Sequence, residues 1–108
     1  MLDKYWLKYD NLDEPVGELL IDFKKDKFNF IQNPKYDGEL PFFLEDPESS
    51  MPMEEQIKIW IENRVPERNY TFIDVLIEKA GLKDYDIYGF FKYNKGQFIS
   101  DKFYIESK

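Results

Sequence analysis

Two pairs of neighbouring carboxylates have the clearest potential for catalysis: Glu54 with Glu55, and Asp84 with Asp86. Two positioned carboxyl groups can act as general acid and general base. Both pairs lie where the sequence predicts the first turn of a helix. Acidic residues at that position cap backbone N–H groups and interact favourably with the helix dipole. We therefore expect these carboxylates to have a structural role.

Other common catalytic and metal-binding groups are missing from the sequence. The chain contains no histidine and no cysteine, and its five glycines are scattered. This excludes a Ser-His-Asp triad, a thiolate site and a disulfide, and no glycine-rich phosphate loop is present. The acidic stretch at residues 10–14 is too short for a calcium loop. The sequence predicts a protein that is not an enzyme and has no cofactor or metal. The alternative is an enzyme whose site is unrecognised.

The segment at residues 60–70 has the composition of a binding surface. It places a tryptophan, two arginines and a tyrosine around Pro66, which must end a helix. Trp, Tyr and Arg are enriched at binding hot spots, and Arg can bind a carboxylate or phosphate through two parallel hydrogen bonds. A turn projecting from a rigid base lowers the ordering cost of binding. The predicted partner-binding residues are Trp60, Arg64, Glu67, Arg68 and Tyr70.

A purely structural interpretation of the same segment is also open. Trp60 stands at helical spacing with Ile57 and Ile61 and so fits a core position. Arg64 and Arg68 would then pair with nearby acidic residues.

These residues must be positioned by a few short elements. Alternating apolar and polar residues predict strands at 5–9, 16–23 and 28–31, the last two joined as a hairpin. Residues 33–50, with three prolines, are expected to be mostly irregular. The apolar run at 40–44 is expected to pack down as a short edge strand.

Helical periodicity begins in the second half of the chain. One helix is predicted from about Pro52 until Pro66 stops it, and a second from about 70 to 80. A third, short helix is predicted at 85–93, followed by a strand at 103–105. The alternative for this last part is a β-hairpin.

Particular residues are expected to cap, end or weaken these helices. Thr71, with Asp74 three residues later, is a candidate capping box for the second helix. Gly81 is expected to end that helix in a Schellman motif, and Asp84 to cap the third helix. Gly89 weakens the third helix by about 1 kcal/mol relative to alanine.

The predicted fold class is α+β, in a single domain at 1–108. A small N-terminal antiparallel sheet or hairpin is followed by two or three short helices and a C-terminal strand. The strands occupy about 5–45 and 102–106, and the helices about 52–93. With 43% hydrophobic and 19% aromatic residues, the core is expected to be rich in aromatic side chains.

Charge and hydropathy limit the possible partners. The chain has 22 acidic and 15 basic residues, a net charge of −7. Direct DNA binding is not expected, because phosphate neutralisation requires a basic face. No apolar stretch approaches the roughly 20 residues that span a bilayer, and the first residues do not form a signal peptide. We expect a cytoplasmic protein with a protein partner, no membrane contact and no small-molecule substrate.

Three groups of residues resemble the small N-terminal domain of HipA-like serine/threonine kinases. The first is a Val-Gly-x-Leu strand with an aromatic strand and a Tyr-containing loop: Val16, Gly17, Leu19, Phe28, Phe30, Pro34 and Tyr36. The second is the turn at residues 63–68, Asn-Arg-Val-Pro-Glu-Arg, similar to the family's Asn-Leu-Leu-Pro-Glu-Gly. The third is Gly81-Leu82, then Tyr85-Asp86 and a Phe90-Phe91 helix that reaches Gly96.

The resemblance covers most of the chain, with some departures. Arg68 stands where the family usually has Gly, residues 40–44 replace its Leu-Ser-Leu-Ser-Leu-Pro strand, and Ser100-Asp101 replaces its Gly-Ala. The resemblance implies a HipS-like antitoxin subunit that restrains a separate HipA-like kinase. An alternative from the charge is an acidic phage or mobile-element inhibitor that mimics nucleic acid. Its acids should form a spaced row, whereas here they are dispersed among lysines.

Overall fold

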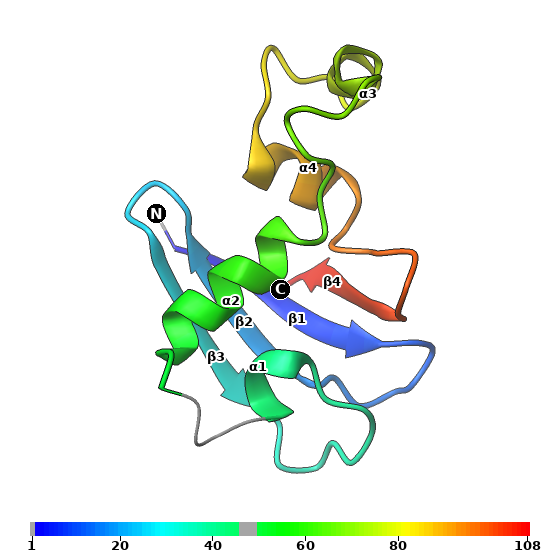
Figure 1. Ribbon diagram of the computed structural model, residues 1–108. Helices are drawn as coiled ribbons and strands as arrows, with labels where there is room; N and C mark the ends of the chain where they lie inside the picture. Colours follow the sequence, from blue (N-terminus) through cyan, green and yellow to red (C-terminus); the bar gives the residue numbers. More distant parts are fainter. Residues whose placement is uncertain (1, 46–49) are drawn as a thin grey trace.

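A four-stranded antiparallel sheet in the order β3-β2-β1-β4 forms the centre of the fold (Figure 1). The computed structural model describes residues 2–45 and 50–108. The strands are β1 (Asp3–Tyr9), β2 (Gly17–Asp22), β3 (Lys27–Gln32) and β4 (Phe103–Ser107). The strands predicted at 5–9, 16–23, 28–31 and 103–105 are confirmed, with small shifts at their ends.

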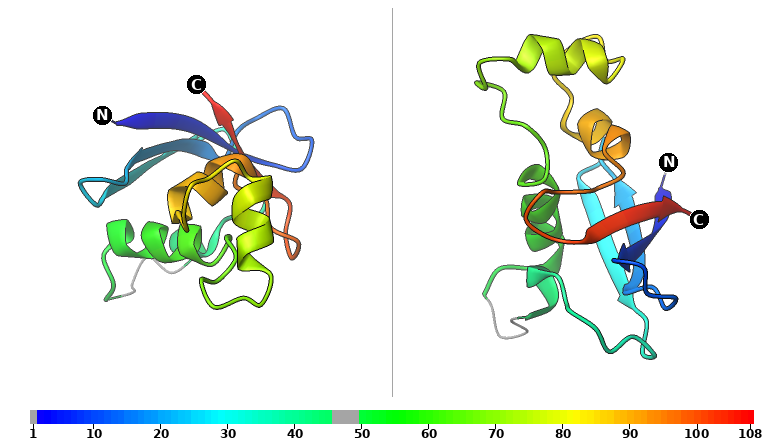
Figure 2. Two further views of the ribbon diagram at one scale, coloured as in Figure 1. Left: turned by 90° about the horizontal axis from the view of Figure 1, so that it is seen from above. Right: turned by 90° about the vertical axis from the view of Figure 1, so that its right-hand side faces the viewer.

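The helices lie mostly on one face of the sheet. They are α1 (Phe42–Glu45), α2 (Met53–Glu62), α3 (Ile73–Lys79) and α4 (Ile87–Tyr93). Figure 2 shows α1 and α2 packed below one sheet face, with α4 beside the end of α2. Helix α3 stands away from the sheet, beyond α4 (Figures 1 and 2). The fold is of the α+β class, as predicted.

The prediction of an edge strand at residues 40–44 is wrong, because this run forms the short helix α1. Pro41 has no N–H group to donate to a sheet, but its fixed φ suits the start of a helix. The Leu44 N–H group donates to the Pro41 carbonyl at 2.9 Å, and Phe43 is buried. The run does pack against the core. Pro47, part of the predicted irregular segment, lies outside the described residues.

The C-terminal part forms a helix and a strand, so the alternative hairpin is excluded. Helices α3 and α4 both end in Schellman motifs. Leu82 N–H donates to the Ile77 carbonyl at 3.0 Å, with Gly81 at φ 72°. Gly96 N–H donates to the Phe91 carbonyl at 2.9 Å. The Schellman motif predicted at Gly81 is therefore confirmed.

The predicted N-terminal caps of these two helices are wrong. Phe72 occupies the N-cap position of α3, with no side-chain cap hydrogen bond, so Thr71 is not the cap. Asp86 occupies the N-cap position of α4, also without a side-chain bond. Asp84 instead accepts a hydrogen bond from the Tyr85 N–H at 2.7 Å. Glu54 lies in the first turn of α2, as expected.

The core is rich in aromatic residues, as predicted. Its buried members come from all four strands and from α1, α2 and α4, and include Leu7, Leu19, Ile21, Phe28, Phe30, Phe43, Ile57, Trp60, Ile61, Phe91, Phe103 and Ile105. The hydroxyl groups of Tyr5 and Tyr88 are hydrogen-bonded at 2.6 Å, and the Tyr88 hydroxyl donates to the Asp3 carboxylate. These two bonds link α4 to β1. That the chain is one domain stays a prediction.

Candidate protein-binding surface

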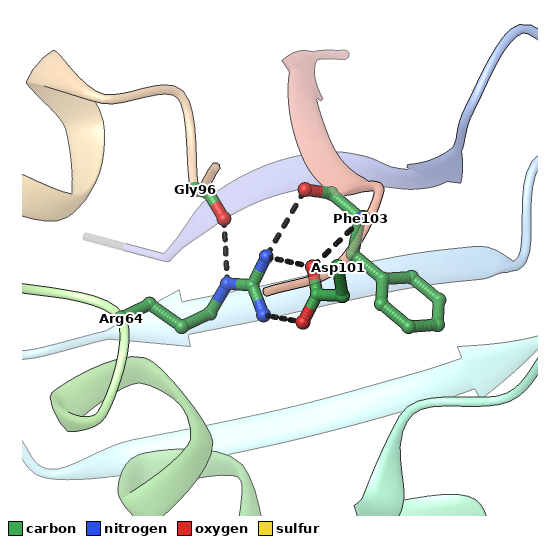
Figure 3. A network of polar contacts seen from close by, with 4 residues as sticks. All are labelled: Arg64, Gly96, Asp101 and Phe103. Atoms are coloured by element: carbon green, nitrogen blue, oxygen red, sulfur yellow. Dashed lines mark hydrogen bonds and ion pairs between the residues drawn. The ribbon is translucent and has the colours of Figure 1, made fainter. Parts of the chain in front are cut away.

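Arg64 lies in the interior and donates four hydrogen bonds to three residues, Gly96, Asp101 and Phe103 (Figure 3). Its Nη1 and Nη2 atoms donate to the two carboxylate oxygens of Asp101, both at 2.7 Å. Its Nε donates to the Gly96 carbonyl at 2.6 Å, and Nη2 also donates to the Phe103 carbonyl at 3.1 Å. Gly96 and Asp101 are the two ends of one loop. Arg64 therefore fixes residues 96–101, here named the clamped loop.

Trp60 is buried as well. Its ring meets those of Phe43, Phe91 and Phe103 near edge-on, with centroids 5.6, 6.2 and 6.3 Å away. The Arg64 guanidinium carbon lies 4.3 Å from the centroid of the Trp60 ring. Trp60 is 4% exposed and Arg64 5%. The expected outward projection of these two side chains is therefore wrong, and any part they have in partner binding must be indirect.

The inward face of helix α2 explains why Trp60 and Arg64 are buried. Helix α2 ends at Glu62, before Pro66 is reached, and the Arg64 N–H still bonds the Ile61 carbonyl at 3.1 Å. Arg64 thus continues the inward face that carries Ile57 and Trp60. The helical periodicity of the sequence predicts a buried position for these side chains, whereas the composition of the segment favours an exposed one. A buried arginine needs a buried partner, which Asp101 supplies from a distant part of the sequence.

The remaining three predicted residues, Glu67, Arg68 and Tyr70, are exposed. The Arg68 guanidinium carbon lies 4.7 Å from the centroid of the Tyr85 ring. The Tyr85 hydroxyl donates to the Pro66 carbonyl at 2.7 Å. These two contacts join the outgoing and returning chain at the base of α3. They define a projecting segment, residues 67–84, here named the α3 arm.

The α3 arm exposes large apolar side chains. Tyr70 is 49% exposed, Phe72 61% and Val75 60%, and no residue of α3 is buried. Phe72 and Val75 are three positions apart, as neighbours on one helix face are, and a core-facing helix would have buried them. The arm returns to the globule where Leu82 meets α4 at Gly89. A Cβ atom at that glycine would lie 2.7 Å from Leu82 Cδ2, which accounts for a glycine inside this helix.

The two edges of the sheet are poor sites for adding a strand. On β3, the Phe28 N–H donates to Glu54 Oε1 at 3.1 Å and the Phe30 N–H to Asn29 Oδ1 at 2.8 Å. On β4, the Ile105 N–H donates to the Lys95 carbonyl at 2.8 Å. Strand addition requires free edge groups, so binding by this mode is disfavoured here.

Ion pairs crowd the sheet face opposite the helices. Glu18 and Glu106 flank Trp6 in the strand register. Lys108 pairs with Glu18 at 2.8 Å and lies 4.5 Å from the centroid of the Trp6 ring, and Lys8 pairs with Glu106 at 3.7 Å. The charged groups on this face thus satisfy one another. The α3 arm is the more apolar candidate surface.

The described residues, 2–45 and 50–108, contain no group of three or more acidic side chains placed to hold a metal ion. No helix in that part of the chain is long and apolar enough to cross a membrane. Comparisons with protein-family models, characterised proteins and solved structures found no match to the chain. What the structure defines is an α+β fold with an exposed apolar arm, and the resemblance to HipA-like kinases stays a prediction.

Acid is expected to weaken the clamp. Burial raises the pKa of Asp101, but hydrogen bonds from Arg64 and the Phe103 N–H lower it more, so the net pKa lies below its ordinary 3.8. The stability that this carboxylate contributes is present above its unfolded pKa and is lost as the pH falls through the folded one. In urea titrations between about pH 5 and pH 3, wild type should lose more stability than Asp101→Asn. Identical pH dependence in the two proteins would contradict this.

Proposed function

We propose that this protein is a non-catalytic binding module that docks on a partner protein through the α3 arm. The exposure of Phe72, at the N-cap of α3, and of Val75, within α3, carries this proposal, since no residue of that helix is buried. An isolated helix of seven residues is unstable in water. A partner that covers its apolar side chains would stabilise the helix and remove apolar surface from water.

The spacing of the exposed side chains fits a groove. Phe72, Val75 and Leu76 stand at positions i, i+3 and i+4, the pattern with which an amphipathic helix anchors in an apolar groove. Asp74 lies on the far side of the helix from Phe72 and Leu76, whereas Glu78 and Lys79, three and four positions after Val75, border the stripe. A groove with an apolar floor therefore suits the arm better than a flat polar surface.

We further propose that the partner is a HipA-like serine/threonine kinase, which this cytoplasmic protein restrains in the manner of an antitoxin. The support is the resemblance, whose central turn at residues 63–68 is the segment that leads into the arm. Glu67 and Arg68 of that turn are exposed at the base of the arm. This proposal leaves the kinase chemistry to the partner.

The alternative of a nucleic-acid mimic has weaker support. Lysines stand beside acids at separate places on the fold, and this interrupts any continuous acidic row. The pairs are Lys8–Glu106, Lys58–Asp26, Lys102–Asp10 and Lys108–Glu18.

The test is binding to a HipA-like kinase that lacks its own N-terminal domain, which is to be sought in the reading frames beside the one that encodes this chain. In calorimetric titrations, Phe72→Ser/Val75→Ser should weaken binding at least tenfold, about 1.4 kcal/mol. The matched control is Leu12→Ser/Ile31→Ser, which alters two exposed apolar residues elsewhere on the surface. The control should bind like wild type.

Two outcomes contradict different parts of the proposal. If wild type does not bind the kinase, the kinase is not the partner. If the arm variant binds as tightly as wild type, the arm is not the contact.

A further inference from the structure

We propose that the clamped loop, residues 96–101, is a second contact for the protein that occupies the α3 arm, with Ile99 as its apolar anchor. This inference rests on the proposed binding function. Arg64 then acts as a positioning residue, since it holds the loop without touching the partner.

The loop presents an exposed apolar tip from a fixed base. Ile99 is 97% exposed and Phe98 40%. Arg64 bonds the Gly96 carbonyl and the Asp101 carboxylate, which stand on either side of that tip. A loop already held in one conformation loses little entropy when it binds. The clamp therefore favours recognition through the tip.

Ile99 belongs to a larger apolar surface. Single exposed apolar residues are common on proteins and need no explanation. Here Ile99 and Phe98 line an open hollow together with Val65, Pro66 and Tyr93. Tyr93 is itself 49% exposed. The tip thus stands at the rim of a site where an apolar side chain of a partner can be received.

This hollow adjoins the arm. Pro66 lines it and also lines a second hollow at the base of the arm, with Tyr70 and Leu76. The chain leading from α2 to α3 lies beside the loop leading from α4 to β4 in Figure 1 and in the right-hand view of Figure 2, and residues of both line the first hollow. One partner seated on the arm therefore extends over Pro66 to the clamped loop.

The charges specify the chemistry of this partner. Lys95 and Lys102 line the hollow beside the loop, where Lys102 already pairs with Asp10 at 3.5 Å, and α3 exposes Asp74 and Glu78 together with Lys79. The complementary surface is apolar, with an acidic group facing Lys95 and a basic group facing Asp74 on the arm. A second copy of the chain is disfavoured, because each copy carries a net charge of −7.

The first test uses the HipA-like kinase of the binding test above. Ile99→Ser should weaken its binding at least tenfold and leave the melting temperature unchanged, because the side chain is exposed. Ile31→Ser, a change of the same type on the open face of the sheet, is the matched control and should bind like wild type. Normal binding by Ile99→Ser, together with lost binding by Phe72→Ser/Val75→Ser, would overturn this inference and leave the proposed function intact.

A double-mutant cycle tests the positioning role. Asp101→Asn should speed hydrogen exchange at the amides of residues 97–100 and weaken binding. If the clamp acts through Ile99, Ile99→Ser/Asp101→Asn should bind no more weakly than Ile99→Ser alone. Additive losses would show that the clamp only supports the fold and would overturn the positioning role.

If the kinase does not bind wild type, photo-crosslinking in cells of the source organism tests whether one protein contacts both the α3 arm and the clamped loop. A photo-crosslinking amino acid is placed at position 72 in one variant and at position 99 in another. The inference requires that both positions crosslink to the same protein, identified by mass spectrometry, and that Asp101→Asn reduces the yield at position 99. Crosslinks to different proteins, or none at position 99, would overturn it.

Discussion

Arg64→Ala is expected to lower the free energy of unfolding by about 3–5 kcal/mol, because it leaves a partly buried carboxylate without its counterion. Asp101 loses both guanidinium hydrogen bonds, and the carbonyls of Gly96 and Phe103 lose theirs. The Trp60 ring also loses the cation stacked on it. Equilibrium unfolding in urea measures the loss directly.

Arg68→Ala is the matched control for this prediction. Arg68 is exposed, and its guanidinium carbon lies 4.7 Å from the centroid of the half-buried Tyr85 ring. Its removal should change stability by less than about 0.5 kcal/mol. Equal effects of the two substitutions would contradict the assignment of Arg64 to the interior.

The sheet and the helices could be predicted because their signals are local. Alternation of apolar residues locates the strands, and helical spacing of Ile57, Trp60 and Ile61 locates α2. The exception is α1, where an apolar run of four or five residues fits a strand or a helix equally well. Pro41 at the start of the run favours a helix, and the helix is stabilised by the burial of Phe43 in the core. That tertiary contact could not be predicted from the sequence.

The candidate site was less predictable because it depends on distant pairs. Arg64 and Asp101 are separated by 37 positions, and nothing local links them. The exposure of Phe72 and Val75 could not be predicted from the sequence either. Their helical spacing is the usual sign of a buried face, and only the projection of α3 from the globule places them in solvent. The apolar tip at Phe98 and Ile99 had no local signal of its own.

Trp60→Ala is expected to cost about 3–5 kcal/mol of folding stability, the range for removal of a buried aromatic ring. The indole contacts rings from three elements, with Phe43 on α1, Phe91 on α4 and Phe103 on β4. Its loss leaves a cavity where these elements meet, and the fixed sheet limits how far they can close it. Urea unfolding should show a lower midpoint at an unchanged m-value.

Trp60→Phe and Trp6→Ala separate this effect from the loss of tryptophan in general. Trp60→Phe keeps an aromatic ring at the junction and should cost less than alanine. Trp6 lies on the open face of the sheet under Lys108, where half-burial gives its removal a smaller cost. A loss below about 1 kcal/mol for Trp60→Ala would mean that the ring does not occupy the core. The Trp60 ring also stacks on the Arg64 guanidinium, so replacing Trp60 should loosen the clamped loop. Amide hydrogen exchange at residues 97–100 should then become faster under conditions in which the rest of the protein stays folded.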